Sequence, residues 1–362
     1  MMCPSIRLNY LLISLGLLLV EFIIATQLTE IVWIRAFFGD FLVVILLYTL
    51  AKSVADVASK SLALGIFGFA CLVEFAQYFK IADILQLTGW ARTVVGTSFS
   101  GYDILMYGLG CLTTYGLDRY VIPRFVSLRL TLIGFTALSM LALNFYQGWL
   151  HFNYPNPQRF PIQGIDVSHY QHSIDWTKLD TQQTRFVYIK ATEGGDFVDP
   201  LFQQNWQQVQ ALKLPVGAYH YFSFCRNGSE QAQNFIHTVP NLATNLPPVI
   251  DLEPGACQGK LPDINGVRQE LQTLLMLLQQ HYAKTPILYL TRDTYELYVK
   301  GALPNVPLWV RDIYQYPHWV TDEAWVLWQY DSRSRLAGIS TYVDRNVFNG
   351  NATQFTAWLQ AS

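Results

Sequence analysis

The feature that most constrains this chain is an abrupt change of preferred solvent near residue 148. Residues 1–148 are long apolar runs broken by short charged turns, whereas residues 162–362 are rich in Asp, Gln, Tyr and Trp. The overall values, 51% hydrophobic residues and a net charge of −2, average over these halves. They give no basic face of the kind that nucleic-acid binding needs, so no nucleic-acid partner is expected. The sequence predicts an α-helical membrane bundle (1–148), a linker (149–161) and an α/β domain (162–362).

Five stretches in the first half are apolar enough to cross a bilayer, which takes a helix of about 20 residues. The first is expected to be retained, because it lacks a convincing small-residue cleavage site and further apolar stretches follow it. The stretches cover about 8–26, 37–51, 61–79, 101–118 and 130–148. They predict a multi-pass protein with the lipid bilayer as a partner.

The basic residues of the short loops predict the orientation, because cytoplasmic loops carry an excess of Lys and Arg. With the N-terminus in the cytoplasm, the inner segments carry six basic residues and the outer loops three. The inner six are Arg7, Lys52, Lys60, Arg119, Arg124 and Arg129, and the outer three are Arg35, Lys80 and Arg92. Five crossings then place residues 162–362 outside the cytoplasmic membrane of a bacterium, in the periplasm. The prolines of residues 149–161 predict a short extended linker.

Acidic residues within the apolar half leave two interpretations open. Glu74, Gln77 and Asp103 could form a functional polar site, or they could hydrogen-bond between helices and hold the bundle together. The pattern around Gly39-Asp40-Phe41, Glu74-x-x-Gln77-Tyr78 and Gly101-Tyr102-Asp103 resembles an uncharacterised bacterial membrane family related to the VanZ-like proteins. That resemblance, over about 8–120, implies no established activity.

In the second half, short β-branched or aromatic runs alternate with helical patterns, which favours a parallel sheet. Helices fit at about 200–212, 229–238, 266–283 and 292–299. The predicted strands are 163–167, 186–191, 216–222, 248–253, 286–290, 307–310, 325–330 and 340–344. Eight strands in about 200 residues predict an irregular, TIM-like (β/α) barrel.

Reactive groups gather at the predicted strand ends, where barrels of this type carry their active sites. Asp166 ends the first strand, Asp251 and Glu253 the fourth, and Asp344 the last. Aromatic and amide side chains at other strand ends are expected to bind substrate: Tyr219, Tyr221, Tyr289, Trp309, Trp328 and Gln329. Acids ringed by aromatic faces suit a glycosidase, because acetal cleavage needs a proton donor beside a carboxylate.

The spacing of Asp251 and Glu253 places both carboxyls on one face of a strand. Two acids that close repel when both are ionised, so one pKa is expected to rise. We assign the raised pKa and the role of general acid to Glu253, whose side chain is longer, and expect Asp251 to stay ionised. An Asp-x-Glu pair alone often does no more than end a strand. The acids at other strand ends make that reading weaker here.

Six motifs in the same half resemble glycoside hydrolase family 25, the Chalaropsis-type lysozymes, over about 162–360. They are Gly164-Ile165-Asp166-Val167-Ser168, Ile189-Lys190-Ala191-Thr192-Glu193-Gly194, Gly217-Ala218-Tyr219-His220-Tyr221, Asp251-Leu252-Glu253, Trp328-Gln329-Tyr330 and Val343-Asp344-Arg345-Asn346. The resemblance implies an irregular (β/α) barrel that hydrolyses the β-1,4 bond between N-acetylmuramic acid and N-acetylglucosamine in peptidoglycan glycan strands. It implies no metal and no organic cofactor.

Carried over by motif, the resemblance gives the acids separate roles. Glu253 would be the acid, and Asp251 would stabilise positive charge or orient the substrate's acetamido group. Asp166 and Asp344 would position the sugar. For His220 and Glu193, a substrate-contacting role and a structural role remain equally open.

Two cysteines lie just beyond neighbouring predicted strands. Because neighbouring strands bring their following loops together, we predict a disulfide between Cys225 and Cys257. It would agree with an oxidising compartment outside the cytoplasm. The alternative is two free thiols.

Other functions compete with that of a muramidase. The second half could be a non-catalytic or sensing module that binds peptidoglycan, against which the intact Asp251 and Glu253 argue. A transporter or sensor that uses Glu74 and Asp103 is a third hypothesis. An enzyme for a related amino sugar polymer such as chitin is the fourth.

Overall fold

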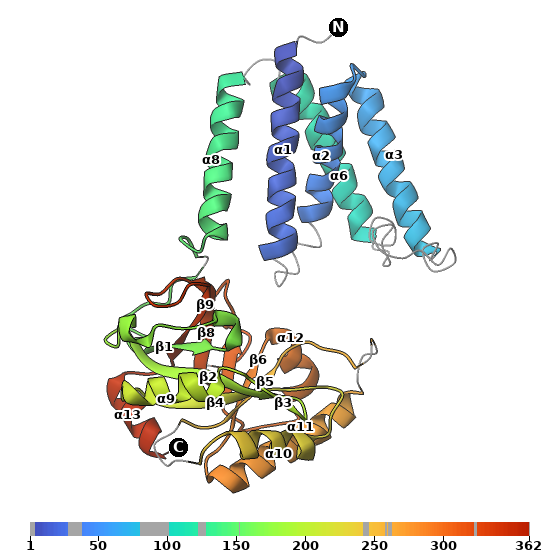
Figure 1. The fold of residues 1–362 in the computed structure, drawn as a ribbon. Coiled ribbons are helices and arrows are strands. Elements are labelled where there is room, and N and C mark those ends of the chain that lie inside the picture. Colours follow the sequence, from blue (N-terminus) through green and yellow to red (C-terminus); the bar gives the residue numbers. More distant parts are fainter. Residues whose placement is uncertain are drawn as a thin grey trace. The chain divides into compact units, whose positions relative to one another are not determined.

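The computed structural model describes residues 4–27, 38–79, 101–121, 128–151, 153–241, 246–257, 259, 263–321 and 324–361. The chain divides into two compact units, Met1–Tyr146 and Gln147–Ser362 (Figure 1). The whole predicted linker 149–161 therefore belongs to the second unit. Phe160, within that stretch, is buried in the core and its ring lies 5.9 Å from the ring of Trp328.

The described part of the first unit is helical, at the places of the five predicted spans. Ile6–Ile24, Ser59–Tyr78 and Arg129–Tyr146 are long and apolar enough to cross a membrane. The helices are α1 (Pro4–Gln27), α2 (Gly39–Val54), α3 (Ser59–Tyr78), α6 (Gly101–Gly116), continued by the π-helical turn η2 (Leu117–Val121), and α8 (Leu128–Tyr146). α2 and α6 have 16 residues each, and α6 continues directly through the five residues of η2. Arg35, Lys80, Arg92 and Arg124, used for the predicted orientation, lie outside the described residues.

The first unit buries charge and exposes apolar side chains. Lys52 Nζ lies 3.1 Å from Asp118 Oδ2, and both side chains are less than a tenth exposed. The hydroxyls of Tyr10 and Tyr48 also donate to Asp118, which joins α1, α2 and η2. Leu72 and Leu112, by contrast, are about two-thirds exposed. A solvent of lipid favours this arrangement, because charges then face one another inside the bundle.

Glu74 takes part in the same kind of contact. Tyr107 on α6 donates a hydrogen bond to Glu74 Oε1 on α3 at 3.1 Å and lies 3.3 Å from Asp40 Oδ1 on α2. Glu74 thus links helices, as the second of the two sequence interpretations expects.

Eight strands of the second unit close into a barrel. Around the barrel the order is β1, β2, β4, β5, β6, β7, β8, β9 and back to β1, and neighbours are parallel except that β9 runs antiparallel to both β8 and β1. The two-residue β3 (Phe197–Val198) pairs with the end of β2. The barrel strands are β1 (Gln163–Val167), β2 (Thr184–Glu193), β4 (Val216–Tyr221), β5 (Val249–Leu252), β6 (Ile287–Leu290), β7 (Leu308–Arg311), β8 (Trp325–Ser334) and β9 (Val343–Phe348). All eight predicted strands form, with ends shifted by a few residues.

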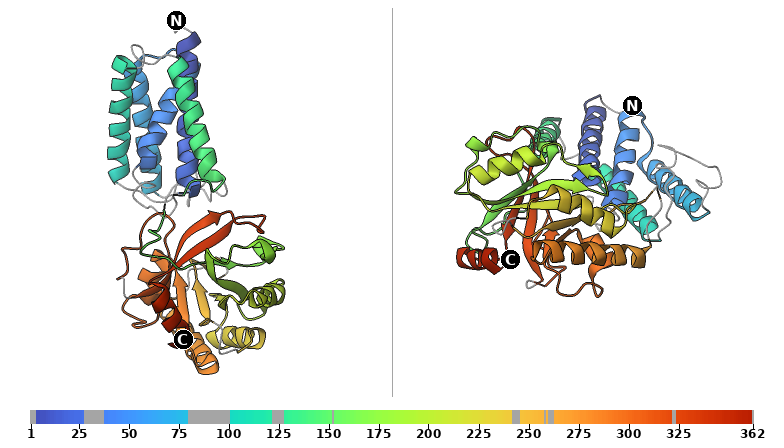
Figure 2. Two further views of the ribbon diagram at one scale, coloured as in Figure 1. Left: turned by 90° about the vertical axis from the view of Figure 1, so that its left-hand side faces the viewer. Right: turned by 60° about the horizontal axis from the view of Figure 1, so that its bottom comes forward.

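Helices follow three of the parallel strands and pack outside the barrel (Figure 2). They are α9 (Phe202–Ala211), α10 (Gly228–Thr238) and α11 (Ile264–Tyr282). The short α12 (Arg292–Thr294) and the π-helical turn η5 (Tyr295–Val299) follow β6, and the 3₁₀ turns η3 (His169–Gln171) and η4 (Trp176–Lys178) follow β1. The side chains between strands and helices form a large apolar core around Trp206, Phe235 and Leu274.

A second apolar core, in which Phe186, Tyr188 and Trp309 meet, fills the inside of the barrel toward the end at which the parallel strands begin. Phe355 of α13 (Ala352–Ala361) belongs to it, so this helix covers the end at which the parallel strands begin. Glycine makes room for these rings: a Cβ at Gly217 would lie 2.2 Å from Tyr188 Cε1. This filled end leaves the carboxyl ends of the parallel strands for the site.

The close approach at Gly217 predicts a stability effect. Gly217→Ala should lower the unfolding free energy of residues 147–362 by about 1–3 kcal/mol, because Tyr188 must move within a packed core. Urea unfolding followed by circular dichroism would measure this. Gly266→Ala is the matched control, because a Cβ at Gly266 on α11 meets its nearest atom at 3.4 Å. Equal stability of the two variants would contradict the packing argument.

Candidate active site

A cavity of about 470 Å³ lies at the carboxyl ends of the parallel strands. Its volume falls in the range of small-molecule sites. Nine of the ten predicted catalytic and substrate-binding residues line it: Asp166, Tyr219, Tyr221, Asp251, Glu253, Tyr289, Trp309, Gln329 and Asp344. The closed barrel therefore brings together residues that are spread over more than 170 positions of sequence.

The four acids reach the cavity from three strands. Asp166 lies near the end of β1, Asp251 lies on β5, and Glu253 follows β5 directly. Asp344 was expected to end the last strand, but it lies near the start of β9. Because β9 is antiparallel, its start lies at the same rim as the ends of the parallel strands, and Asp344 pairs with Asp166 across the ladder.

Asp166 is the acid with the best-defined surroundings. It is 8% exposed, and Asn346 Nδ2 donates to its Oδ2 at 2.8 Å. Asn346 is itself held by Trp309 Nε1, which donates to Asn346 Oδ1 at 2.9 Å. Burial raises the pKa of Asp166 to about 7; the hydrogen bond from Asn346 opposes the shift, and the charge of Glu253 adds to it. Asp166 therefore holds a proton up to near-neutral pH.

Asp251 departs from the sequence expectation. Its Oδ1 is buried, and among the described residues none hydrogen-bonds to that atom. Burial, followed by the charges of Glu253 and Asp166, raises the pKa of Asp251 well above its usual value. Burial therefore acts against the ionised Asp251 that the sequence predicts, because the barrel wall removes water from its carboxyl group.

A chain of polar groups crosses the cavity floor. The Tyr289 hydroxyl lies 2.5 Å from Gln329 Oε1 and 3.4 Å from Glu253 Oε1. The Gln329 side chain also hydrogen-bonds to Asp344, which opposes the rise that burial and Asp166 cause in the pKa of Asp344. Glu253 on one side of the cavity is thus connected to Asp344 on the other.

Trp328 does not line the cavity, so the expectation that it contacts substrate is wrong. Its side chain is 1% exposed in the core outside the barrel, and its Nε1 donates to the carbonyl of Asp312 at 2.9 Å. Successive residues of a strand face opposite sides. Since Gln329 faces the cavity, Trp328 on the same strand must face the helices.

His220 likewise faces away from the cavity. It is fully buried, with Nδ1 at 2.7 Å from Thr192 Oγ1 and Nε2 at 3.0 Å from Gln231 Oε1. Burial lowers its pKa to about 4. The structural interpretation of His220 is therefore the better one.

Lys190, Arg311 and Tyr170 are among the cavity-lining residues that sequence reasoning missed. Lys190 is buried, pairs with Glu193 at 2.7 Å and lies 4.9 Å from the centre of the Tyr221 ring. The charge of Arg311 lowers the pKa of Asp166 against the effect of burial. A lysine inside the otherwise apolar run of residues 186–191 was the available signal for Lys190.

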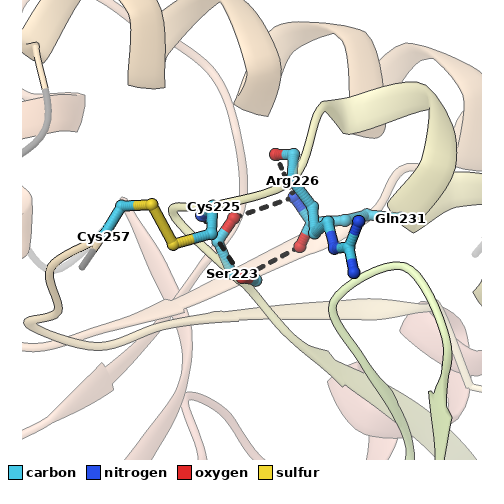
Figure 3. The surroundings of a disulfide bond; sticks show 5 residues. All are labelled: Ser223, Cys225, Arg226, Gln231 and Cys257. Carbon is cyan, nitrogen blue, oxygen red and sulfur yellow. Dashed lines mark hydrogen bonds between the residues drawn. A yellow bond between two sulfur atoms is a disulfide. The ribbon is translucent and has the colours of Figure 1, made fainter.

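A disulfide joins the loops that follow β4 and β5. Cys225 and Cys257, which are 32 positions apart, are bonded, as predicted (Figure 3). Beside it, the amide of Ser223 donates to Gln231 Oε1 at 2.7 Å, which ties the loop after β4 to α10. Cys257 follows Glu253 by four residues, so the bond restrains the segment that carries this acid.

Comparison with known proteins agrees with this geometry. Residues 165–339 match the glycosyl hydrolases family 25. A solved family 25 glycosyl hydrolase from Bacillus anthracis is 40% identical, covers 58% of this chain and 97% of its own, and superposes with a TM-score of 0.54. The chain belongs to glycosyl hydrolase family 25. It is a glycoside hydrolase, and its closed barrel is the fold of that family.

Two sequence relatives extend the comparison. Lysozyme M1 of Streptomyces globisporus is 30% identical over 54% of this chain and 70% of its own length. The uncharacterised protein YegX of Escherichia coli (strain K12) is 36% identical over 56% of this chain and 75% of its own. Residues 29–111 match DUF2809, a family of unknown function. The relationship to the VanZ-like proteins stays a prediction.

The burial of Asp166 predicts a pH-dependent stability. Between about pH 4 and 7 the folded domain keeps a proton on Asp166 that the unfolded chain releases, so stability falls as pH rises through this window. Asp166→Asn should therefore stabilise residues 147–362 at pH 8, by as much as about 4 kcal/mol, and far less at pH 4. Urea unfolding at both pH values measures the difference. Asp175→Asn, at an exposed aspartate, is the control, and an equal gain at both pH values would contradict the assignment.

The disulfide predicts a second stability effect. Replacing Cys225 and Cys257 together by Ser should lower the unfolding free energy by about 3–4 kcal/mol, because a loop of 32 residues is no longer closed in the unfolded chain. Thermal unfolding with and without a reductant would test this. The reductant should shift the parent domain toward the double variant and leave the variant unchanged. A parent domain insensitive to the reductant, with no mass change of the two peptides, would contradict the bond.

Proposed function

We propose that this chain is a membrane-anchored lysozyme that hydrolyses the β-1,4 bond between N-acetylmuramic acid and N-acetylglucosamine in peptidoglycan. The observation that carries the proposal is the convergence of Asp166, Asp251, Glu253 and Asp344 on one cavity in a family 25 barrel. The relative from Streptomyces globisporus, which is named a lysozyme, supports the choice of peptidoglycan as substrate.

Glu253 is the general acid in this proposal, and its contact with Tyr289 supports the role. The Tyr289 hydroxyl donates to Gln329 Oε1 at 2.5 Å and to Glu253 Oε1 at 3.4 Å. These contacts hold the half-buried Glu253 carboxyl at the cavity, where a general acid must lie to protonate the leaving oxygen of a glycosidic bond.

Asp251 interacts with the acetamido group of the amino sugar in this proposal. Asp251 lines the cavity, and its buried Oδ1 receives no hydrogen bond from any described residue. An N–H group of a substrate's acetamido group would supply the missing partner and would favour the ionised carboxylate. The ionised group could then orient the acetamido group or stabilise positive charge at the reacting carbon.

Asp166, Asp344 and the cavity aromatics hold the sugar. Asp166 is held by Asn346 and Asp344 by Gln329, so hydrogen bonds within the protein position both carboxyls. Tyr219, Tyr221 and Tyr289 provide ring surfaces and hydroxyls in the same cavity. Trp309 acts through Asn346, which makes it a positioning residue.

The first unit anchors the enzyme with its N-terminus in the cytoplasm. In this proposal all five helices cross the membrane, and the buried pair of Lys52 and Asp118 lies inside the bundle. Three helices have the length and hydropathy for a crossing by themselves. An odd number of crossings places the barrel outside the cytoplasm, where the wall and an oxidising environment are found.

Replacing Glu253 tests the mechanism. Glu253→Gln should lower the rate of hydrolysis by about 10²- to 10⁴-fold, because the amide cannot protonate the leaving oxygen. New reducing ends released from isolated peptidoglycan by residues 147–362 measure the rate. Glu296→Gln, at an exposed glutamate on η5, should keep the parent rate. If Glu253→Gln released reducing ends at the parent rate, Glu253 would not be the general acid. Activity of the parent on chitin alone would contradict peptidoglycan as the substrate.

A further inference from the structure

The first residues after α8 lie along two strands that extend beyond the barrel rim. β8 pairs with β7 only as far as Gln329, but it continues to Ser334, paired with β9 alone. Residues 331–344, the end of β8, the connecting loop and the start of β9, are called the arm here. Arg335 of the arm donates from Nε to the carbonyl of Gln147 at 2.9 Å and from Nη2 to Gln147 Oε1 at 3.1 Å.

Two further contacts hold residues 147–151, the segment that follows α8, against the arm. Gly148 has φ +71°, and a Cβ there would lie 2.0 Å from the carbonyl oxygen of Arg333, so only glycine fits. His151 Nδ1 lies 3.1 Å from Asp331 Oδ1. Residues 147–151 are therefore held on the barrel unit and do not form a free tether.

The arm also forms part of the cavity rim. Ser332 of the arm lines the cavity, and so does Gln171, whose Nε2 donates to the carbonyl of Tyr342 at 3.0 Å. The guanidinium groups of Arg333 and Arg335 each lie 4.7 Å from the centre of the Tyr342 ring. One short piece of chain thus contacts both the cavity mouth and the segment that leaves α8.

The segment exposes side chains that suit a bilayer surface. Trp149 is 62% exposed and Leu150 is 38% exposed. Arg335, which contacts Gln147 two residues before Trp149, is also exposed. Trp149 follows the end of α8, Tyr146, by three residues, so the covalent chain keeps it within about 11 Å of that helix end. Tryptophan is enriched at the membrane interface, and arginine binds phosphate groups.

We propose that Trp149, Leu150 and Arg335, which we call the juxtamembrane face, bind the anionic headgroups of the bilayer surface and hold the cavity mouth beside the membrane. The inference rests on the proposed anchoring through α8. Its consequence for the enzyme is a substrate class: glycan strands that lie close to the membrane, rather than strands in the outer layers of the wall.

Residues 147–362 are suitable for the test, because they form a compact unit and the solved Bacillus anthracis relative consists almost entirely of the matching part. The fragment is sedimented with vesicles of phosphatidylcholine, with and without phosphatidylglycerol. We expect binding to the anionic vesicles that weakens with salt. Arg335→Gln should weaken it by about fivefold, and Trp149→Ser should weaken it and remove the quenching of tryptophan fluorescence by brominated lipid.

Matched controls lie away from the arm. Lys213→Gln changes an exposed lysine that precedes β4, at the opposite end of the barrel, and Met276→Ser changes an exposed apolar residue on α11. Both should bind vesicles like the parent. If these controls lose binding as the face variants do, or if the parent does not prefer anionic vesicles, the juxtamembrane face is refuted.

Hydrolysis of isolated peptidoglycan, measured on the same samples without vesicles, separates the two proposals. Parent, face variants and controls should all release reducing ends at one rate, because the face is not part of the cavity. The juxtamembrane face is supported if only Arg335→Gln and Trp149→Ser lose vesicle binding and both still hydrolyse peptidoglycan. Vesicle binding that depends on the face, in a fragment that cleaves no wall material, would overturn the lysozyme proposal and leave the membrane contact standing.

Discussion

The mutual repulsion of buried acids in the barrel mouth is the interaction on which the site depends. Asp166, Asp251 and Asp344 all lose water to the barrel wall, and the charge of a neighbouring acid raises the pKa of each one further. Such a cluster is costly to fold, and two apolar cores, one inside the barrel and one outside it, offset that cost. The hydrogen bonds from Asn346 to Asp166 and between Gln329 and Asp344 oppose the rise in the pKa of these two acids.

Alternation along single strands could be read from the sequence, but contacts between strands could not. The runs at 163–167 and 216–222 predicted β1 and β4 within one residue, and the acids at strand ends predicted the cavity. Applied strictly, the same alternation would have excluded Trp328 from the predicted substrate-binding residues, because it neighbours Gln329 on β8. The direction of β9, the relay from Trp309 to Asn346 and the position of Arg311 arise from barrel closure, which no local pattern encodes.

In the helical unit, too, local patterns were predictable and contacts between distant residues were not. Its apolar runs predicted where helices form, because each run is locally complete. The partners of its buried charges were not predictable, since Lys52 and Asp118 are 66 positions apart in sequence. Lys52 entered the sequence argument as a loop charge, yet it is buried in an ion pair. Lys52 therefore belongs both to the charges from which the orientation is predicted and to those that hold the helices together.

The barrel strands differ in length, and β8, one of the longest, reaches both the cavity and the segment that follows α8. β6 and β7 have four residues each and stop at the rim, whereas β8 has ten and continues past it. The same strand presents Gln329 to the cavity and Asp331 to His151 of the segment that follows α8. One strand therefore carries a cavity residue and, two residues further on, a contact to the segment that follows α8. If that helix anchors the enzyme, as we propose, the anchor would contribute to the choice of substrate, because it would determine which glycan strands can reach Glu253.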